Sequence, residues 1–473
     1  MKTTALLLTA CFAITGSLSA QQIHSSNPSV DKVFALSVNI VDENTHQGIL
    51  AAGGDYGGEW ARDASINAWN GVSLIRPKVA LNSLWNVTGN KDSIAHQYWD
   101  KIIWVPAAWN HYKITGDRQF LTEAYRCAAK TMSQLEYQQF DHKTGLFMGP
   151  SVFNDGIAGY PIPIFEPGNL RSGVLDHKKS LGIKALSTNC IYMEAYACLA
   201  EMALELDTNN DRQHEARVYT RQSLELARNI REKFYNPATN SCIYFLDREN
   251  KPYDYQEGLG ISYIALFGIL SKAEAKALIV NAKTSPYGIT SIYPDFERYS
   301  AEKPGRHNNL IWPQVNGFFA KAAVQTGNYP VFEKELYGLT QLALDPDKGN
   351  GDLKEIYNAI TGAPDGGWQS DFHWKSCNKQ TWSATAYIDM ILSGIAGINF
   401  ADAGTIRFTP YLPKGMREFS LTNIKYRKAQ LTVNLSGQGS SIKRFEVNGM
   451  TQKEPVISGE LVGAVVVDVV MGE

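Results

Sequence analysis

Two carboxylic residues, Asp155 and Glu355, lie in polar and aromatic segments where they could serve acid–base chemistry. Asp155 is in the middle of a predicted loop, with Phe153 and Tyr160 nearby in the sequence. We expect these neighbours to create an apolar setting, which raises the pKa of a carboxyl group toward the value that a general acid needs. Glu355 precedes a Tyr-Asn pair and a Thr-Gly turn. The alternatives are an ordinary turn residue for Asp155 and an ordinary surface acid for Glu355.

Residues 57–63 lead into a predicted helix and combine Trp60, Arg62 and Asp63. In the functional interpretation, the indole of Trp60 is a stacking platform for a sugar ring, and Arg62 and Asp63 bind sugar hydroxyls. Asp63 also stands where an acid stabilises the first turn of a helix, so helix capping is the alternative.

Aromatic and polar residues recur together in segments 149–161, 305–317, 353–369 and 380–387. The candidates for substrate binding in these segments are Tyr160, His307, Asn308, Trp312, Tyr357, Trp368 and Trp382. The chain has 10 Trp, 23 Tyr and 19 Phe, many of them beside Gly, Asp, Asn or His. Aromatic faces beside polar groups suit a sugar ring, with its apolar C–H faces and hydroxyl edges. A large core that uses many aromatic residues is the alternative interpretation.

The elements that must position these residues are mostly helices, because the periodicity between about residues 64 and 398 is helical. The predicted helices lie near residues 29–37, 64–87, 100–114, 119–139, 187–206, 210–233, 258–269, 272–283, 311–325, 329–344 and 380–398. Several form pairs with short connections, which predicts a toroid of helical hairpins rather than a simple bundle. No motif repeats with a fixed period, and this disfavours a solenoid.

Long loops and a C-terminal change of pattern complete the predicted organisation. The loops at 42–63, 141–186, 284–310 and 345–379 are rich in Gly, Pro, Asp and aromatic residues, as expected for ordered loops that line a site. From about residue 400 the pattern alternates like strands, and Asn448-Gly449 is a strong hairpin signal. We therefore expect a toroid domain at residues 21–399 and a small antiparallel β-domain with a structural role at 400–473.

The first twenty residues predict export. Lys2 is followed by a short apolar run that ends before Ala20, the pattern of a secretory signal peptide. The alternative is a lipoprotein signal that would place a lipid on Cys11. No other stretch has the length of apolar sequence that a membrane span needs. The expected location is therefore periplasmic or secreted.

Composition excludes several other functions. The 45 basic and 47 acidic residues give a net charge of −2, and no run of Lys or Arg could follow a nucleic-acid backbone. The five cysteines after the signal lack C-x-x-C spacing, so we expect small buried side chains rather than a disulfide framework or a zinc site: Cys127, Cys190, Cys198, Cys242 and Cys377. No metal-binding motif is present, and we predict neither a metal nor a cofactor.

In this order, the candidate segments resemble the α-toroid glycosidases: glycoside hydrolase family 63, the family 37 trehalases and the glucosidase domain of glycogen-debranching enzymes. The resemblance to family 63 rests on Glu355 within a Glu-x-Tyr-Asn-x-x-Thr-Gly segment and on Trp382-Ser383-Ala384 at a helix start. The Trp-Ala-Arg-Asp segment at 60–63 and the His-Asn-x-x-Ile-Trp-Pro segment at 307–313 are also similar to segments of these enzymes. The resemblance covers about residues 50–400, and the β-domain resembles the cap of such enzymes.

The resemblance implies an (α/α)6 toroid and an inverting glycoside hydrolase, with Glu355 as general base and an Asp as general acid; the N-terminal pattern adds that the enzyme is exported. Asp155 suits the acid position best, although Glu166 and Asp176 lie in the same long loop. Inversion needs a protonated carboxyl on the leaving-group oxygen and an ionised one that activates water, roughly 6.5–9.5 Å apart. The expected substrate is an oligosaccharide with α-linked glucose or mannose. The alternatives are a carbohydrate-binding toroid without catalysis, a polysaccharide lyase and a phosphorylase.

Overall fold

The computed structural model describes residues 21–472. The predicted signal peptide, its cleavage site at Ala20 and Cys11 lie outside the described residues. Within the described part of the chain, no helix combines the length and the apolar composition that a membrane crossing requires.

The main body is a double ring of helices. In the inner ring each helix packs on the next and the last packs on the first, in the order α2 (Ala61–Asn67), α5 (Trp104–Thr115), α7 (Leu186–Leu206), α9 (Gly258–Leu266), α11 (Pro313–Gln325) and α13 (Thr381–Asp389). The outer helices alternate with these along the chain: α1 (Pro28–Glu43), α4 (Pro77–Asn86), α6 (Arg118–Gln139), α8 (Gln213–Phe234), α10 (Lys272–Asn281) and α12 (Tyr329–Leu344). The predicted toroid of helical hairpins is confirmed.

Burial differs between the two rings. In α8 the buried side chains include Leu226, Ile230 and Phe234, spaced four residues apart, and the opposite face is exposed. This is the pattern of a helix with one apolar face. In α9 every residue from Gly258 to Ala265 is buried, because other helices cover it on several sides. The outer helices therefore enclose a buried inner ring.

The helix predicted at 64–87 is broken in the structure. It divides into α2, the π-helical segment η1 (Ala68–Val72), the short α3 (Ser73–Ile75) and α4. Gly71 has a φ of 134°, and a Cβ atom there would lie 2.7 Å from the side chain of Ile388. The helix therefore departs from regular geometry where α13 approaches it. A second π-helical segment, η6 (Met390–Ile395), continues α13.

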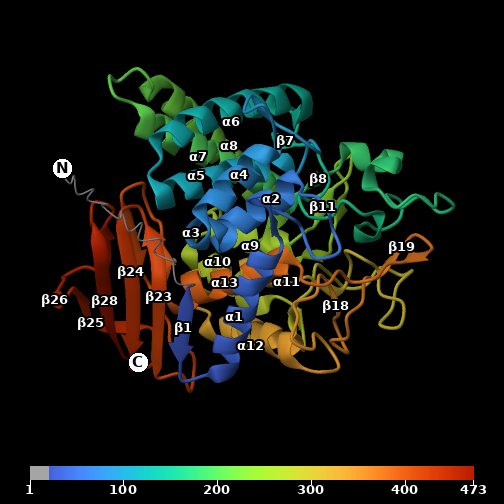
Figure 1. The fold of residues 1–473 in the computed structure, drawn as a ribbon. Helices are drawn as coiled ribbons and strands as arrows, with labels where there is room; N and C mark the ends of the chain where they lie inside the picture. The colour runs from blue at the N-terminus through green and yellow to red at the C-terminus, as the bar shows by residue number, and fades with distance from the viewer. Residues whose placement is uncertain (1–20, 473) are drawn as a thin grey trace, which may run out of the picture.

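The long loops gather at the end of the toroid where inner helices α2, α11 and α13 begin, opposite the C-terminal sheet (Figure 1). They carry 3-10 turns η2 (Lys101–Ile103), η3 (Ile157–Gly159), η4 (Val174–Asp176) and η5 (Lys178–Gly182), and a three-stranded ribbon of β8 (Lys184–Ala185), β11 (Phe245–Leu246) and β12 (Pro252–Tyr253). Paired two-residue strands there include β13 (Gln256–Glu257) with β16 (Ile292–Tyr293), β17 (Leu310–Ile311) with β18 (Tyr357–Asn358), and β19 (Trp368–Gln369) with β20 (Phe372–His373).

Other two-residue strands close the turns between helices. The pairs are β2 (Thr45–His46) with β3 (Ile49–Leu50), β4 (Thr88–Gly89) with β5 (Ser93–Ile94), β6 (Phe140–Asp141) with β7 (Leu146–Phe147), β9 (Tyr235–Asn236) with β10 (Ser241–Cys242), and β14 (Thr284–Ser285) with β15 (Gly288–Ile289). These ribbons hold the hairpin ends against the ring.

The C-terminal domain consists of two small sheets. The larger has the strand order β1 (Gln22–Ser25), β23 (Glu418–Tyr426), β24 (Ala429–Ser436), β28 (Gly463–Gly472), β25 (Ser441–Val447) and β26 (Met450–Thr451). The smaller contains β21 (Ile398–Asn399), β22 (Thr405–Phe408) and β27 (Val456–Ser458). The N-terminal strand β1 thus joins a sheet that is otherwise built from the end of the chain.

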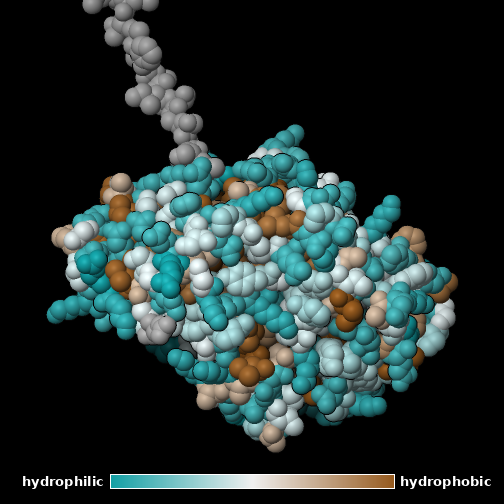
Figure 2. Space-filling model, turned by 90° about the horizontal axis from the view of Figure 1, so that it is seen from below, coloured by the Kyte–Doolittle hydropathy of each residue, from teal (hydrophilic) through white to brown (hydrophobic). Residues whose placement is uncertain are grey.

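The prediction of a purely antiparallel β-domain needs one correction. Strands β24 and β28 run parallel. The last strand, β28, lies between β24 and β25 in the sheet. It pairs antiparallel with β25 and therefore runs in the same direction as β24. On the face of the molecule in Figure 2, apolar side chains lie in small separate groups among hydrophilic ones.

Candidate active site

A cavity of about 330 Å³ lies where α2, α11 and α13 begin, under the long loops. Trp60, Trp312 and Gln380 directly precede these three helices, and each lines the cavity. The helix starts therefore deliver side chains from distant parts of the chain to one place. Predicted site residues that line this cavity are Trp60, Arg62, Asp63, Asp155, His307, Trp312, Glu355 and Trp382.

Glu355 is a buried carboxyl group held at both oxygens. Arg306 Nη2 donates to Oε1 at 2.8 Å, and the hydroxyl of Tyr56 donates to Oε2 at 3.0 Å. The backbone N–H of Cys377 also donates to Oε2, at 3.3 Å. These contacts set the orientation of the carboxylate. Burial and the negative charge of Glu355 raise the pKa of Tyr56 far above its usual value, so the phenol remains a donor.

Asp155 is held by Arg62 and His307 and remains open to the cavity. Arg62 Nη2 donates to Oδ2 at 3.2 Å, and His307 Nε2 lies 3.3 Å from Oδ1. The side chain is still 36% exposed. Burial acts to raise the pKa of Asp155, but the charge of Arg62 and the proximity of His307 hold it below its usual value. The expected apolar setting with a raised pKa is therefore wrong, because residues from two other segments surround this carboxyl.

Arg62 is the centre of a buried cluster of carboxyl groups. Besides Asp155, its guanidinium lies 3.6 Å from Asp100 and donates to the carbonyl of Phe153 at 3.1 Å. Burial raises the pKa of both Asp63 and Asp100 to about 7. One guanidinium thus serves several carboxyl groups, and the cluster retains protons near neutral pH. Arg62 was expected to bind sugar hydroxyls, but its hydrogen bonds run to Asp155 and to the backbone.

His307 is a neutral imidazole beside Asp155. Burial lowers its pKa to about 3. Its ring stacks on Trp312 with centroids 4.7 Å apart, and among the described residues Nδ1 has no hydrogen-bond partner. With its Nε2 near the carboxyl of Asp155, His307 positions the carboxyl without adding a full charge.

Indole rings form the walls and the rim of the cavity. Trp312 and Trp382 meet edge to face, with centroids 5.9 Å apart, and the N–H group of each is buried without a partner in the described part of the chain. At the rim, Trp60 is 44% exposed and Trp374 is 38% exposed. Apolar faces with free N–H donors are suited to a ring that carries hydroxyl groups.

Four other predicted binding residues do not line the cavity: Tyr160, Asn308, Tyr357 and Trp368. Their polar groups serve the loops instead. The hydroxyl of Tyr160 accepts from the backbone of Ser151 and donates to the carbonyl of Asn154, at 2.9 and 2.7 Å.

The other three residues have similar structural roles. The hydroxyl of Tyr357 accepts from the backbone N–H of Lys354 at 2.8 Å, and Asn308 Oδ1 accepts from Phe296 N–H at 3.3 Å. The ring of Trp368 lies beside His373, with centroids 5.2 Å apart. These contacts shape the loops that carry Glu355 and His307.

Glu166 and Asp176, the other candidates for the acid, also lie away from the cavity lining. Asp176 forms an exposed ion pair with Arg171 at 3.4 Å. Of the three candidate acids in the long loop, Asp155 is the one that lines the cavity.

Sequence reasoning missed four side chains that shape the site: Tyr56, Asp100, Arg306 and Trp374. Arg306 had a signal, since it directly precedes His307 in a segment that was singled out. No sequence signal indicated Tyr56 or Asp100, because each is a common type of residue in a segment without other distinguishing features. Their importance depends on Glu355 and Arg62, which are distant in the sequence.

The hydrogen bond from Tyr56 allows a graded test. We expect Tyr56→Phe to lower kcat by about 10–100-fold, because a hydrogen bond to a charged group contributes about 1.5–3 kcal/mol. Tyr56 is half-buried at the cavity, so we expect the thermal midpoint to change little. Steady-state kinetics and a thermal melt measure both quantities. An unchanged kcat would contradict the role of Tyr56 in holding Glu355.

Family models match two separate parts of the chain. Residues 168–382 match the mannosylglycerate hydrolase MGH1-like glycoside hydrolase domain, a segment that includes Glu355. Residues 400–451 match the C-terminal domain of glycosyl hydrolase family 65. No curated protein has significant sequence similarity to the chain.

Similar solved structures have the same type of fold at low sequence identity. A sialidase matches with a TM-score of 0.69 and 14% identity over 91% of this chain, which spans only 40% of the sialidase. A family 63 mannosylglycerate hydrolase of Thermus thermophilus, in complex with glucose, has a TM-score of 0.57 and 14% identity, over 76% of this chain and 99% of its own. A family 78 rhamnosidase of Bacillus sp. GL1 has a TM-score of 0.59 and 12% identity, over 96% of this chain and 44% of its own. The resemblance to toroid glycosidases is confirmed, and residues 168–382 are similar to a glycoside hydrolase domain.

Proposed function

We propose that this protein is an inverting glycoside hydrolase in which Glu355 is the general base and Asp155 the general acid. The observation that carries the proposal is that two carboxyl groups from separate loops line one cavity with indole walls, each held by its own arginine. Inverting hydrolases use two such groups, separated enough for a water molecule to enter.

Glu355 suits the base because every contact made to it is a donor contact. Arg306 and Tyr56 hold the two oxygens, and a carboxylate has further lone pairs with which to accept a hydrogen bond from water. In the proposed step, water attacks the anomeric carbon while Glu355 takes its proton, and the configuration at that carbon inverts.

Asp155 suits the acid because it is the exposed end of the cluster around Arg62. The cluster retains protons near neutral pH through the raised pKa of Asp63 and Asp100. We infer that a proton of this cluster resides on Asp155 when substrate fills the cavity, because loss of water disfavours the charged carboxylate. Asp155 then gives the proton to the glycosidic oxygen as the bond breaks.

This arrangement predicts an alkaline limb in the pH dependence of kcat/KM. A general acid is lost as it deprotonates, so activity falls as the pH rises. Asp155 has a lowered pKa, and Asp63 and Asp100 release protons near pH 7. We therefore expect kcat/KM to fall above about pH 7 at the latest. Initial rates between pH 4 and pH 9 measure this; full activity maintained at pH 9 would contradict the assignment.

We further propose that the substrate contains an α-linked mannose or glucose residue. Support comes from the similarity to mannosylglycerate hydrolase-type domains and from the indole walls, which suit a hydroxylated ring. A cavity of about 330 Å³ is at the small end of ligand sites, which favours a short oligosaccharide or a glycoside with a small aglycone. The N-terminal pattern supports export, which N-terminal sequencing of the processed protein would test by a start at Gln21.

The deciding experiment is a product assay on α- and β-linked gluco- and manno-oligosaccharides and on mannosylglycerate. Proton NMR of the anomeric signals at early times is expected to reveal a β-sugar released from an α-linked substrate. Initial release of the α-anomer would contradict inversion. A rate that depends on phosphate would indicate a phosphorylase, and an ultraviolet-absorbing unsaturated product would indicate a lyase. Binding without any product would favour a binding protein.

A further inference from the structure

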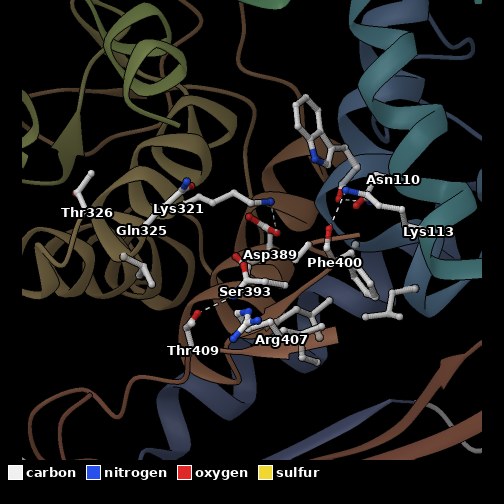
Figure 3. A pocket seen from close by; sticks show the side chains of 18 of the residues that line it. Asn110, Lys113, Lys321, Gln325, Thr326, Asp389, Ser393, Phe400, Arg407 and Thr409 are labelled. Atoms are coloured by element: carbon white, nitrogen blue, oxygen red, sulfur yellow. Dashed lines mark hydrogen bonds and ion pairs between the residues drawn. The ribbon is translucent and has the colours of Figure 1, made fainter. Parts of the chain in front are cut away.

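A second cavity, of about 700 Å³, lies at the opposite end of the toroid. The same inner helices line both cavities. Trp312, directly before α11, lies at the first cavity and Gln325, the last residue of α11, lies at the second, about 20 Å away along the helix. On α13, Trp382 lies at the first and Asp389 at the second. Strands β21 and β22 of the C-terminal domain form part of the wall of this cavity, which we call the distal cavity (Figure 3).

The lining of the distal cavity is strongly basic. It contains one acid, Asp389, and five basic side chains: Lys113, Lys272, Lys276, Lys321 and Arg407. The whole chain has a net charge of −2, so this positive charge is a local concentration. A hollow lined by charges of one sign attracts ligands of the opposite sign.

Helix capping does not account for this charge. Lys113 is in the last turn of α5, where a cation stabilises the helix dipole. Lys272, however, is the first residue of α10, where the dipole favours an anion. Lys272 and Lys276 are exposed, and neither forms an ion pair within the described residues. Their positive charge is available to a ligand.

The distal cavity also contains a buried acceptor that its neighbours leave unused. Asp389 is only 5% exposed; its Oδ1 lies 3.1 Å from Lys321 Nζ, and its Oδ2 has no partner among the described residues. In Figure 3 the side chain of Lys321 reaches across to Asp389. A free carboxylate oxygen inside a basic cavity cannot bind a simple anion, but it accepts a hydrogen bond from a hydroxyl group. The cavity is therefore suited to a ligand with both an anionic group and hydroxyl groups.

Aromatic side chains are the third feature of the distal cavity, after its basic residues and the free carboxylate oxygen of Asp389. Trp69 is half-buried, stacks on Phe267 at an interplanar angle of 9°, and lies 6.0 Å from Lys321 Nζ. Phe400 lines the same cavity, as Figure 3 shows. Both π-helical segments, η1 and η6, also contribute lining residues, and such departures from α-helical geometry are frequent at functional sites.

We propose that the distal cavity binds an acidic sugar, a hexuronic acid either free or as a residue of a polysaccharide. The basic side chains bind the carboxylate, Asp389 Oδ2 accepts from a hydroxyl, and Trp69 and Phe400 supply apolar surface for the ring. This site is separate from the proposed catalytic cavity, and its existence does not depend on the proposed hydrolysis.

The test is calorimetry of the wild-type protein with sodium glucuronate and with trigalacturonate, at constant ionic strength. Glucose and sodium sulfate are the comparison ligands, since one lacks the charge and the other the hydroxylated ring. We expect saturable binding of at least one uronic acid, tighter than that of glucose and of sulfate. Binding of glucuronate identifies a site for the free acid, and binding of trigalacturonate alone identifies a polysaccharide site.

Charge-reversal variants test whether the uronic acid binds in the distal cavity. Lys276 and Arg407 are exposed, so Lys276→Glu and Arg407→Glu are expected to fold normally. Each is expected to weaken uronate binding by about tenfold or more, with the hydrolysis rate unchanged. The matched control is Lys233→Glu on outer helix α8, with the same change of charge and no expected effect. The proposal is overturned by absent uronate binding, by equally tight sulfate or glucose binding, or by unchanged affinity in both variants.

Discussion

Replacement of Glu355 by glutamine is expected to lower kcat by about 10²–10⁴-fold, the typical contribution of a positioned general base. The amide retains the shape of the side chain and an oxygen that can accept from Arg306, 2.8 Å from the carboxylate in the native protein. It cannot take a proton from the attacking water. KM is expected to change much less than kcat, because the indole walls of the cavity remain in place.

The experiment combines steady-state kinetics with a thermal melt. A clear fall in the midpoint is expected, since Arg306 would remain buried beside a neutral partner. Glu166→Gln is the matched control, because Glu166 lies in a long loop but does not line the cavity. The base assignment fails if Glu355→Gln hydrolyses the substrate at close to the wild-type rate, or if Glu166→Gln loses activity equally.

Much of the fold could be predicted because the outer helices each have one buried face. In α8 the buried residues recur at intervals of three, four and seven positions, which is a clear helical period. The closure of the inner ring has no such signal, because helices such as α9 are buried all round. The break at Gly71 depends on contact with Ile388, more than 300 residues away, and sequence periodicity cannot report it.

The β-domain illustrates a similar limit. Alternation along β24, β25 and β28 indicates strands but not their neighbours. The insertion of β28 between β24 and β25 is set by contacts between distant segments. The sequence therefore predicted the elements of this domain and missed its one parallel pair.

The candidate site was predictable in its residues but not in its electrostatics. The short motifs around Arg62, His307 and Glu355 named residues that the structure brings together at one cavity. The setting of Asp155 was inferred from its neighbours in the sequence, Phe153 and Tyr160. Its neighbours in space are Arg62 and His307, which belong to other segments and hold its pKa down rather than up. The local sequence shows which side chains are present in a segment, but the charges that surround each side chain depend on the fold.

Replacement of Asp155 by asparagine is expected to have the second large effect on activity. It distinguishes the role of a general acid from that of a general base. We expect kcat/KM for a natural oligosaccharide to fall by about 10²–10⁴-fold, because the leaving oxygen no longer receives a proton. A glycosyl fluoride of the same sugar needs little help from an acid, since fluoride leaves without a proton. Asp155→Asn is therefore expected to retain much of its activity on the fluoride, whereas Glu355→Gln loses activity on both substrates.

The control for Asp155→Asn is Asp176→Asn, the same change in the same loop at a residue that does not line the cavity. It is expected to keep wild-type rates on both substrates. Asparagine still has an oxygen to accept from Arg62, 3.2 Å from the native carboxyl, so Asp155→Asn is expected to remain folded. Loss of activity on the fluoride as large as that on the oligosaccharide would show that Asp155 is not the acid. Asp63 and Asp100, whose pKa is raised to about 7 beside the same arginine, would then be the next candidates for the proton donor.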